Sequence, residues 1–167
     1  MNTETQNSNT ILCPNINQCD IIISTPVARY GMKVGEVFAD MISLNVPGIP
    51  FCNENNEICG RISLKHVLSS GCLPDDILKN AYLLGDSLTH LGTPVDKLTQ
   101  LMQKSVDSFV IATLPTISST SPLLKALALI RHYQSNYIFV VDEGKYLGVV
   151  TMLGLAKKIL KQVKDNE

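Results

Sequence analysis

The sequence lacks a charge imbalance, a long apolar run and a targeting segment. Its formal net charge is −1 and it has no basic block, which argues against a nucleic-acid footprint. No apolar run approaches the roughly 18 residues that a membrane span needs. The first residues, Met1 to Thr10, have neither the basic start nor the apolar core of a signal peptide. We therefore predict a cytoplasmic protein with no nucleic-acid partner and no membrane partner.

The cysteines are few and poorly spaced for cross-linking or metal binding. There are 5 of them, an odd number, and no C-x-x-C pair occurs: Cys13, Cys19, Cys52, Cys59 and Cys72. A disulfide framework or a structural zinc site is therefore not expected. Cys13 and Cys19 are close enough in sequence for a redox pair or a poor metal clip, but reduced thiols are the favoured interpretation.

The chain is long enough for one core or for two small cores that share an interface. It has 167 residues, of which 45% are hydrophobic and 17% charged, as in globular rather than disordered proteins. The most informative stretch contains two apolar runs, Tyr137 to Val141 and Tyr146 to Val150, on either side of a turn with one glycine. This pattern predicts a β-hairpin. Thr151 follows, and apolar residues then recur at helical spacing.

The same order of elements occurs twice. Gly60 and Ser63 stand where Gly148 and Thr151 stand later, a shift of 88 positions in both cases (60 to 148, 63 to 151). Self-similarity at a fixed period indicates a repeat. The sequence therefore predicts four regions: a disordered tail over 1–19, a first repeat over 20–72, a helical connector over 73–106 and a second repeat over 107–164.

Several element boundaries follow from local signals. Apolar runs predict strands over 20–24 and 109–112. Gly71 is predicted to cap the end of a short helix. Ser121 and Pro122 are predicted to be the N-cap and the first residue of another helix.

The connector is predicted to hold two amphipathic helices rather than a loose linker. The first is expected to begin at Pro74, with acids in its first turn, and to end at Gly85. The second is expected to begin after Thr93 and to extend to Val106.

Two β-α-β-β-α units of this size resemble a tandem pair of CBS domains, the regulatory arrangement often called a Bateman module. The motifs that carry the resemblance are Ile49-Pro-Phe-Cys52 and Gly60-Arg-Ile-Ser63 in the first repeat, and Ser121-Pro122, Phe139-Val-Val-Asp142 and Gly148-Val-Val-Thr151 in the second. The resemblance covers 20–72 and 107–164. It implies an α/β fold whose repeats pack with pseudo-twofold symmetry, and a homodimer.

By this resemblance the chain is expected to bind an adenosine-containing ligand between its repeats, without requiring a cofactor. Apolar strand residues can clamp a purine, and a hydroxyl beside a helix N-terminus can contact ribose or phosphate. The predicted residues of the first site are Thr25, Val27, Ile49 and Pro50, with Ser63 at the polar end. The predicted residues of the second site are Thr113, Ile117, Ile138 and Phe139, with Thr151 at the polar end.

The sequence departs from the nucleotide-binding pattern at one position in each repeat. Members that bind nucleotides usually carry a carboxylate three residues after the Ser or Thr, and here that position holds His66 and Gly154. Neither offers an ionised acceptor for ribose hydroxyls, a hydrogen bond that contributes roughly 1.5–3 kcal/mol. Lys65 and His66 favour a phosphate-rich or other anionic ligand in the first site, or are simply solvated residues. Ser63 and Thr151 are also expected to cap their helices.

Two functions remain open at this point. The first is a stand-alone regulatory module that binds AMP, ADP, ATP or another adenosyl compound and controls a separate effector protein. The alternative is a protein-interaction or scaffold module that has lost nucleotide binding. No nucleophile with a base, carboxylate pair or metal set is apparent, so an enzyme is not predicted.

Overall fold

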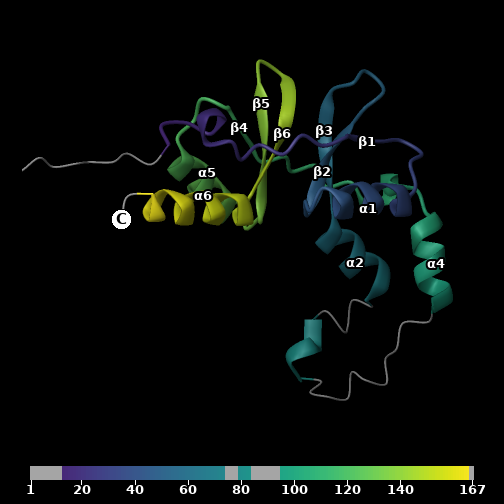
Figure 1. Ribbon diagram of the computed structural model, residues 1–167. Helices are drawn as coiled ribbons and strands as arrows, with labels where there is room; N and C mark the ends of the chain where they lie inside the picture. The colour runs from purple at the N-terminus through teal and green to yellow at the C-terminus, as the bar shows by residue number, and fades with distance from the viewer. Residues whose placement is uncertain (1–12, 74–78, 84–94, 166–167) are drawn as a thin grey trace, which may run out of the picture.

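The computed structural model describes residues 13–73, 79–83 and 95–165. The first repeat contains a three-stranded sheet of order β1-β2-β3 (Figure 1). Its strands are β1 (Ala28–Arg29), β2 (Gly48–Cys52) and β3 (Ile58–Ser63), with β1 parallel to β2 and β2 antiparallel to β3. The turn between β2 and β3 is held by Asn53, whose Oδ1 accepts hydrogen bonds from two backbone amides.

Two helices flank this sheet. Helix α1 (Val34–Ser43) buries one apolar stripe at helical spacing, namely Val34, Val37, Phe38 and Met41. Its first turn is closed by Glu36, whose carboxylate accepts a hydrogen bond from the Lys33 amide at 3.0 Å. Helix α2 (Leu64–Cys72) follows β3 directly.

The second repeat has the same order and register. Its sheet is β4-β5-β6, and its elements are β4 (Thr116–Ile117), α5 (Leu123–His132), β5 (Tyr137–Asp142), β6 (Lys145–Thr151) and α6 (Met152–Lys164). A two-residue turn joins β5 to β6, and Glu143 and Gly144 both have positive φ there, as such a tight hairpin requires. Gly48 pairs with Ser63 as Tyr137 pairs with Thr151. The predicted α/β fold of two repeats is confirmed.

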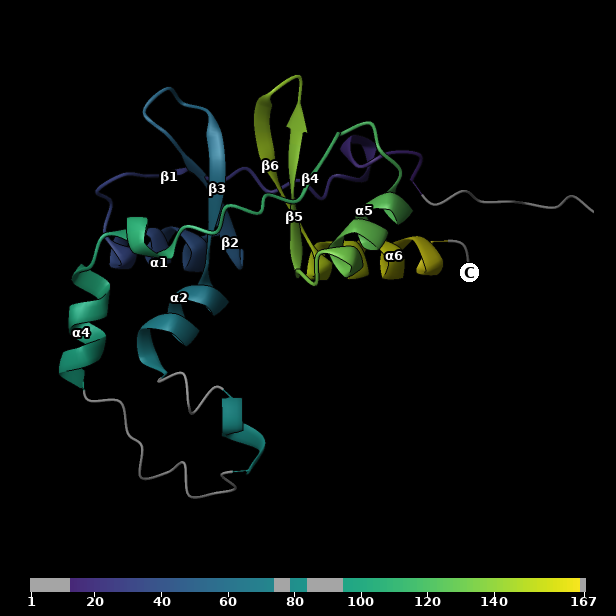
Figure 2. The same ribbon diagram turned by 180° about the vertical axis from the view of Figure 1, so that it is seen from behind.

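The two repeats lie side by side. In both views the hairpins stand next to each other, and α1, α2, α5 and α6 lie at their base (Figures 1 and 2). One apolar core fills the first repeat and another the second. A smaller cluster of Tyr137, Phe139 and Val149 lies on the β5–β6 hairpin.

The segment that precedes each repeat packs on the other repeat. We call residues 13–24 the first leading segment and residues 101–112 the second. Ile16, Cys19 and Ile21 are buried in the core of the second repeat. Leu101, Val106 and Phe109 are buried in the core of the first. The chain therefore crosses over between its repeats at both segments.

This crossover corrects the prediction of a disordered tail over 1–19. Residues 13–19 are ordered and contain a short 3₁₀ helix, η1 (Asn17–Cys19). The amides of Ile16 and Asn17 donate hydrogen bonds of 3.0 Å to the carbonyls of Ser121 and Ser119. Burial of Ile16 on the second repeat gives this stretch the tertiary contacts that its local sequence does not reveal. Residues 1–12 lie outside the described part of the chain.

In the connector, the predicted second helix is present as α4 (Val95–Gln103), followed by the 3₁₀ helix η4 (Val106–Phe109). The described part of the predicted first helix includes a 3₁₀ turn, η2 (Ala81–Leu83). Its expected start at Pro74 and end at Gly85, and the cap at Thr93, lie outside the described residues.

Gly71 does not cap α2, because the helix continues to Cys72 and its C-cap is Leu73. A Cβ on Gly71 would lie 2.6 Å from Leu101 Cδ1. The glycine therefore provides room for α4 to pack against α2. Gly71, which was predicted to end the helix, is explained by this packing instead.

Three further boundaries differ from the prediction. The expected strands over 20–24 and 109–112 are reduced to single bridges at Ile23 and Ile111. The N-cap of α5 is Pro122 rather than Ser121. None of the helices in the described ranges is long and apolar enough to cross a membrane.

Candidate ligand-binding sites

Two cavities lie where the repeats meet, at equivalent positions. The larger, of about 460 Å³, is lined by Cys19, Asp20, Ile21, Ile22, Ile23, Leu44, Asn45, Thr151, Leu153, Gly154, Lys157, Lys158 and Lys161. The smaller, of about 280 Å³, is lined by Pro47, Arg61, Ser63, Lys65, His66, Ser69, Ile111, Gln134, Ser135, Asn136 and Tyr137. Ile23 in the first corresponds to Ile111 in the second, and Thr151 to Ser63, by the same shift of 88 positions found in the sequence.

Each cavity is built from both repeats because each leading segment crosses over. Ile23 pairs with Val149 of β6 through amide-to-carbonyl hydrogen bonds of 2.9 and 2.8 Å. Ile111 pairs with Arg61 of β3 through two hydrogen bonds of 2.9 Å. A ligand in either cavity would therefore contact the helix N-terminus of one repeat and the leading segment of the other.

Two glycines allow these close approaches of backbone to backbone. A Cβ on Gly148 would lie 2.5 Å from the Ile23 carbonyl oxygen. A Cβ on Gly60 would lie 2.9 Å from the Ile111 carbonyl oxygen. Only glycine fits at either position without displacing the paired segment.

The start of α6 gives the larger cavity its one hydroxyl group, that of Thr151. Thr151 is buried, and its Oγ1 accepts a hydrogen bond from the Gly154 amide at 3.0 Å. The Met152 amide donates to the Asn136 carbonyl at 2.8 Å. The predicted cap by Thr151 is thus confirmed, and Gly154 leaves the adjoining wall without a side chain.

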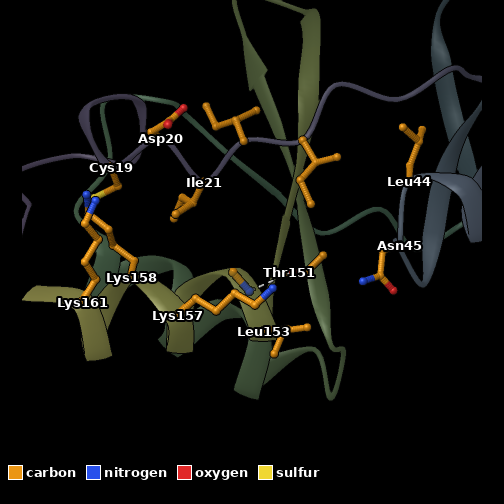
Figure 3. Close-up of a pocket in the computed structure, with 13 residues that line it drawn as sticks. Cys19, Asp20, Ile21, Leu44, Asn45, Thr151, Leu153, Lys157, Lys158 and Lys161 are labelled. Carbon is orange, nitrogen blue, oxygen red and sulfur yellow. Dashed lines mark hydrogen bonds between the residues drawn. The ribbon is translucent and has the colours of Figure 1, made fainter.

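The rest of the larger cavity divides into an apolar wall and a charged wall. Ile21 lies above α6, and Leu44 with Asn45 lies at one end (Figure 3). Ile22 and Ile23 also line the cavity. Lys157, Lys158 and Lys161 project from α6, and the last two lie toward Cys19 at the other end (Figure 3). Asp20 is the single carboxylate among the lining residues.

The smaller cavity has a different polar end. Ser63 makes no side-chain capping bond to α2, so the expected cap there is wrong. The Tyr137 hydroxyl accepts a hydrogen bond of 3.4 Å from Arg61 Nη1 at this end. Tyr137 takes this position because Gly48 lies beneath its hydroxyl and has no side chain to exclude it.

Arg61 and Tyr137 form a second contact through the ring, with the guanidinium carbon 5.5 Å from the ring centroid. Burial raises the pKa of Tyr137, and the charge of Arg61 partly opposes this rise. The hydroxyl therefore stays protonated at neutral pH. Arg61 Nε is buried and has no hydrogen-bond partner among the described residues.

The structure divides the predicted site residues into lining and core groups. Thr151 and Gly154 line the larger cavity, and Ser63, Lys65 and His66 line the smaller one. The residues Ile49, Pro50, Ile117, Ile138 and Phe139 are buried and line neither.

The predicted site residues that directly follow the two leading segments line neither cavity. Thr25 and Val27 are half-buried and Thr113 is exposed. Thr25 Oγ1 hydrogen-bonds instead with the Tyr146 hydroxyl at 2.7 Å. The first leading segment accompanies Thr151 rather than Ser63, because it pairs with β6.

Some lining residues were not predicted. Asn45 and Gln134 both have positive φ, at +57° and +48°, in equivalent turns after α1 and α5. Arg61, Tyr137 and the α6 lysines also belong to the lining. The available signal was the apolar stretch at the start of each predicted repeat, Ile21 to Ile23 and Val110 to Ile111, which was predicted to be a strand of that repeat.

Among the described residues, no group of three or more His, Cys, Asp or Glu side chains could hold a metal ion. The five cysteines are free thiols. The lining side chains thus offer hydroxyl, amide and cationic groups for noncovalent binding.

Comparison with known proteins gives a partial family match and a shared fold. Residues 98–161 match the family model of the CBS domain. A search of curated proteins finds no relative of this chain. Many solved structures match its fold.

Three of these structures illustrate the likeness. The CBS domain of a CBS domain-containing membrane protein from Sphaerobacter thermophilus is 21% identical, with a TM-score of 0.62 and 89% of each chain covered. The CBS domain pair of protein MJ0100, in complex with 5′-methylthioadenosine and S-adenosyl-L-methionine, is 17% identical, with a TM-score of 0.59, covering 89% of this chain and 97% of that one. CBSX2 in complex with AMP is 17% identical, with a TM-score of 0.60, covering 88% and 97%.

Proposed function

We propose, from the premise that this chain has the fold of a CBS domain pair, that it is a regulatory module for an adenosine-containing nucleotide or metabolite. The ligand binds between the repeats and changes how the protein acts on a separate partner. Two of the structural neighbours hold adenosyl compounds, namely AMP in one and S-adenosyl-L-methionine with 5′-methylthioadenosine in the other. The role is regulatory, and no catalytic step is assigned to it.

The observation that carries this proposal is the shared construction of each cavity. In the larger one, the Ile21–Ile23 stretch and Leu44 come from the first half of the chain, and Thr151 and Gly154 come from the second. A ligand that contacts both halves favours the arrangement in which they fit it. The resulting shift in population is limited by the difference between the ligand's affinities for the two arrangements.

A melting panel tests the proposal. The full chain is heated alone and with millimolar AMP, ADP, ATP, NADH or S-adenosylmethionine. A ligand present at a hundred times its dissociation constant adds about 2.7 kcal/mol to the free energy of unfolding, which gives a clear rise in Tm. If none of the five compounds raises the Tm, the sensor proposal fails.

The alternative is a scaffold that no longer binds nucleotides. His66 and Gly154, which stand where a ribose-binding carboxylate would be, favour this alternative. A Tm that none of the five compounds raises, together with a stable complex between this chain and a partner protein, would support it. The hydroxyls at Ser63 and Thr151 and the apolar cavity walls favour the sensor.

We further propose that the protein acts as a cytoplasmic homodimer. Its helices expose large apolar side chains, among them Ile42 on α1 at 68% and Leu124 on α5 at 64% exposure, which a second copy would cover. Light scattering is then expected to give twice the chain mass of 18.3 kDa. A mass of one chain at high concentration would refute the dimer.

A further inference from the structure

Two cysteine thiols lie close together in the core of the second repeat. Cys19 is buried there at 1% exposure, and Cys13, which is half-buried, packs against the same apolar cluster. The chain turns between them, and the Cys19 amide donates a hydrogen bond of 3.1 Å to the Ile16 carbonyl in this turn. The Cys13 thiol is near enough to add to the rise in the pKa of Cys19. One short stretch of the first leading segment therefore supplies two neighbouring thiols.

The turn that carries these thiols is fixed to the second repeat on two sides. The amides of Ile16 and Asn17 donate hydrogen bonds to carbonyls of that repeat. From α6, Gln162 Nε2 donates a hydrogen bond of 3.3 Å to Cys13 Sγ. These contacts hold the Cys13 sulfur against α6 and keep Cys19 beside it. The fold thus positions the two thiols relative to each other.

The two thiols differ in their access to solvent. A small molecule can reach Cys13, which is half-buried, whereas Cys19 can react only with a group that Cys13 carries or admits. Burial raises the pKa of Cys19 to about 12, and the positive charge of Lys158 partly opposes this rise. Because the thiolate is the reactive form, Cys13 is the thiol that a reagent in solution meets first.

Packing alone accounts for Cys19 but not for the pair. A buried cysteine often serves as a small apolar residue, and Cys19 fits that role. Cys13 is only half-buried, and its sulfur accepts a hydrogen bond from an amide side chain. A metal clip is less suitable because, within the described ranges, no group of three or more His, Cys, Asp or Glu side chains could hold the ion. Covalent chemistry between the two thiols uses both of them.

We propose that Cys13 and Cys19 are a thiol–disulfide site, which a low-molecular-weight disulfide oxidises through Cys13. The Cys13 thiolate attacks one sulfur of that disulfide, whose S–S bond breaks, and one small thiolate leaves and takes up the proton that Cys13 released. Cys19 loses its proton and attacks the Cys13 sulfur of the mixed disulfide, and the second small thiolate leaves and takes up that proton. The protein loses two hydrogens and two electrons, and the small disulfide is reduced to two thiols.

The first step assists the second. Once Cys13 is part of a mixed disulfide, it no longer carries the thiol that adds to the rise in the pKa of Cys19, whereas the charge of Lys158 still favours the Cys19 thiolate. The product closes residues 13–19 into a loop on the core of the second repeat. In a reducing compartment the pair stays reduced until an oxidant accumulates, as is usual for redox-sensing thiols. No nucleotide takes part, so this inference is independent of the proposed ligand.

The test follows each thiol of the full chain across glutathione buffers. The reduced chain is equilibrated at increasing ratios of oxidised to reduced glutathione, free thiols are blocked with N-ethylmaleimide, and tryptic peptides are weighed. Trypsin releases residues 1–29 as one peptide that contains both Cys13 and Cys19, so their link appears as two missing hydrogens and two missing labels. The exposed Cys59 is the internal control. The link is expected at a ratio at least about tenfold lower than the mixed disulfide at Cys59, because the second thiol is held at a high effective concentration.

Two variants and one condition complete the test. C13A is expected to leave Cys19 as a free thiol at every ratio, and C59S is expected to leave the link unchanged. In urea the link is expected to need a higher ratio than in the folded chain, because the fold no longer holds the thiols together. The inference is overturned by a lasting mixed disulfide on Cys13 beside a free Cys19, by a link that needs the same ratio as Cys59, or by a link that forms as readily in urea.

Discussion

Gly154 is the residue at which the ribose contact can be tested most directly. A Cβ there would lie 3.3 Å from Thr151 Oγ1, so a side chain fits after a small adjustment. We expect G154D to bind adenosine more tightly by about tenfold or more, because a charged hydrogen bond contributes roughly 1.5–3 kcal/mol. The measurement is calorimetry with adenosine, which has no phosphate for the new carboxylate to repel.

The neutral variant G154N is the control, because it adds a side chain of the same size without the charge. If G154D and G154N bind adenosine equally well, the ribose does not lie beside Thr151. Both variants also remove a glycine from a helix, which is expected to raise stability by only about 0.3 kcal/mol in each, because Asn and Asp are themselves weak helix formers.

The cysteine thiols are expected to differ in their rates of alkylation. Burial raises the pKa of Cys19 to about 12, and the hydrogen-bonded thiol of Cys13 adds to the rise. Cys59 is exposed. Because the thiolate is the reactive form, iodoacetamide at pH 8 is expected to modify Cys59 first and Cys19 last, as followed by peptide mass mapping. Alkylation of Cys19 as fast as Cys59 would contradict the packing of the first leading segment.

The contact of Asp142 with Ser118 and Ser119, at the end of β5, is expected to weaken in acid. The pKa of its carboxyl is lowered by hydrogen bonds from the Ser119 hydroxyl, the Ser119 amide and the Ser118 hydroxyl. A carboxyl whose pKa is lower in the folded state stabilises the fold above its unfolded pKa, and this stabilisation is lost as the pH falls through the folded value.

Urea unfolding at pH 7 and at pH 3 is expected to show that D142N is less stable than the wild type at pH 7, and that the two converge toward pH 3. A difference that stays constant with pH would show that the carboxylate charge is not what matters.

Residue types were predicted better than residue roles. Thr151 caps α6 as expected, since a hydroxyl before a helix has few other local partners. Ser63 occupies the equivalent position but does not cap α2, and it shares a cavity with Tyr137. That neighbour lies in the other repeat, so no local pattern could reveal it.

At the scale of elements, Gly148 is the position at which a substitution is expected to disturb the crossover most. G148A would place a Cβ 2.5 Å from the Ile23 carbonyl oxygen, which belongs to a backbone that is itself hydrogen-bonded to β6. We expect a loss of about 2 kcal/mol or more in the free energy of unfolding, in the upper part of the usual range for single substitutions. Urea unfolding of the full chain measures it.

Gly144 provides the control for G148A, because a Cβ there meets nothing within 4 Å. Its positive φ of 78° is one that asparagine tolerates. G144N is therefore expected to cost less than about 1 kcal/mol. If G148A is as mild as G144N, the leading segment is held less closely than its hydrogen bonds indicate.

Hairpins and amphipathic helices were predictable because their signals are local. The β5–β6 hairpin and α1 follow from period-two and period-3.6 patterns within their own residues. The strands predicted over 20–24 and 109–112 became single bridges because each pairs with a strand in the other repeat. Gly71 was misassigned for the same reason, since its partner Leu101 lies in the connector.

At the scale of the whole molecule, the 88-residue period predicted two like halves but not their interlocking. Similarity between repeats is visible in one sequence, whereas the choice of partner for each leading segment depends on three-dimensional packing. That choice determines which residues share a cavity. This is why Ser63, Lys65 and His66 line one cavity, while Thr25 and Val27, which were predicted beside Ser63, line neither.

The crossover also sets an order of events during synthesis. The first repeat cannot complete its core until Leu101, Val106 and Phe109 have left the ribosome. Ile16 and Ile21 must wait longer, because their partners include Val140 and Val150. At about 5–20 residues per second, the stretch between residues 111 and 150 takes about 2–8 s to be made. For that time the apolar side chains of the first leading segment have no partner, and they are open to a chaperone or to the same segment of a neighbouring nascent chain.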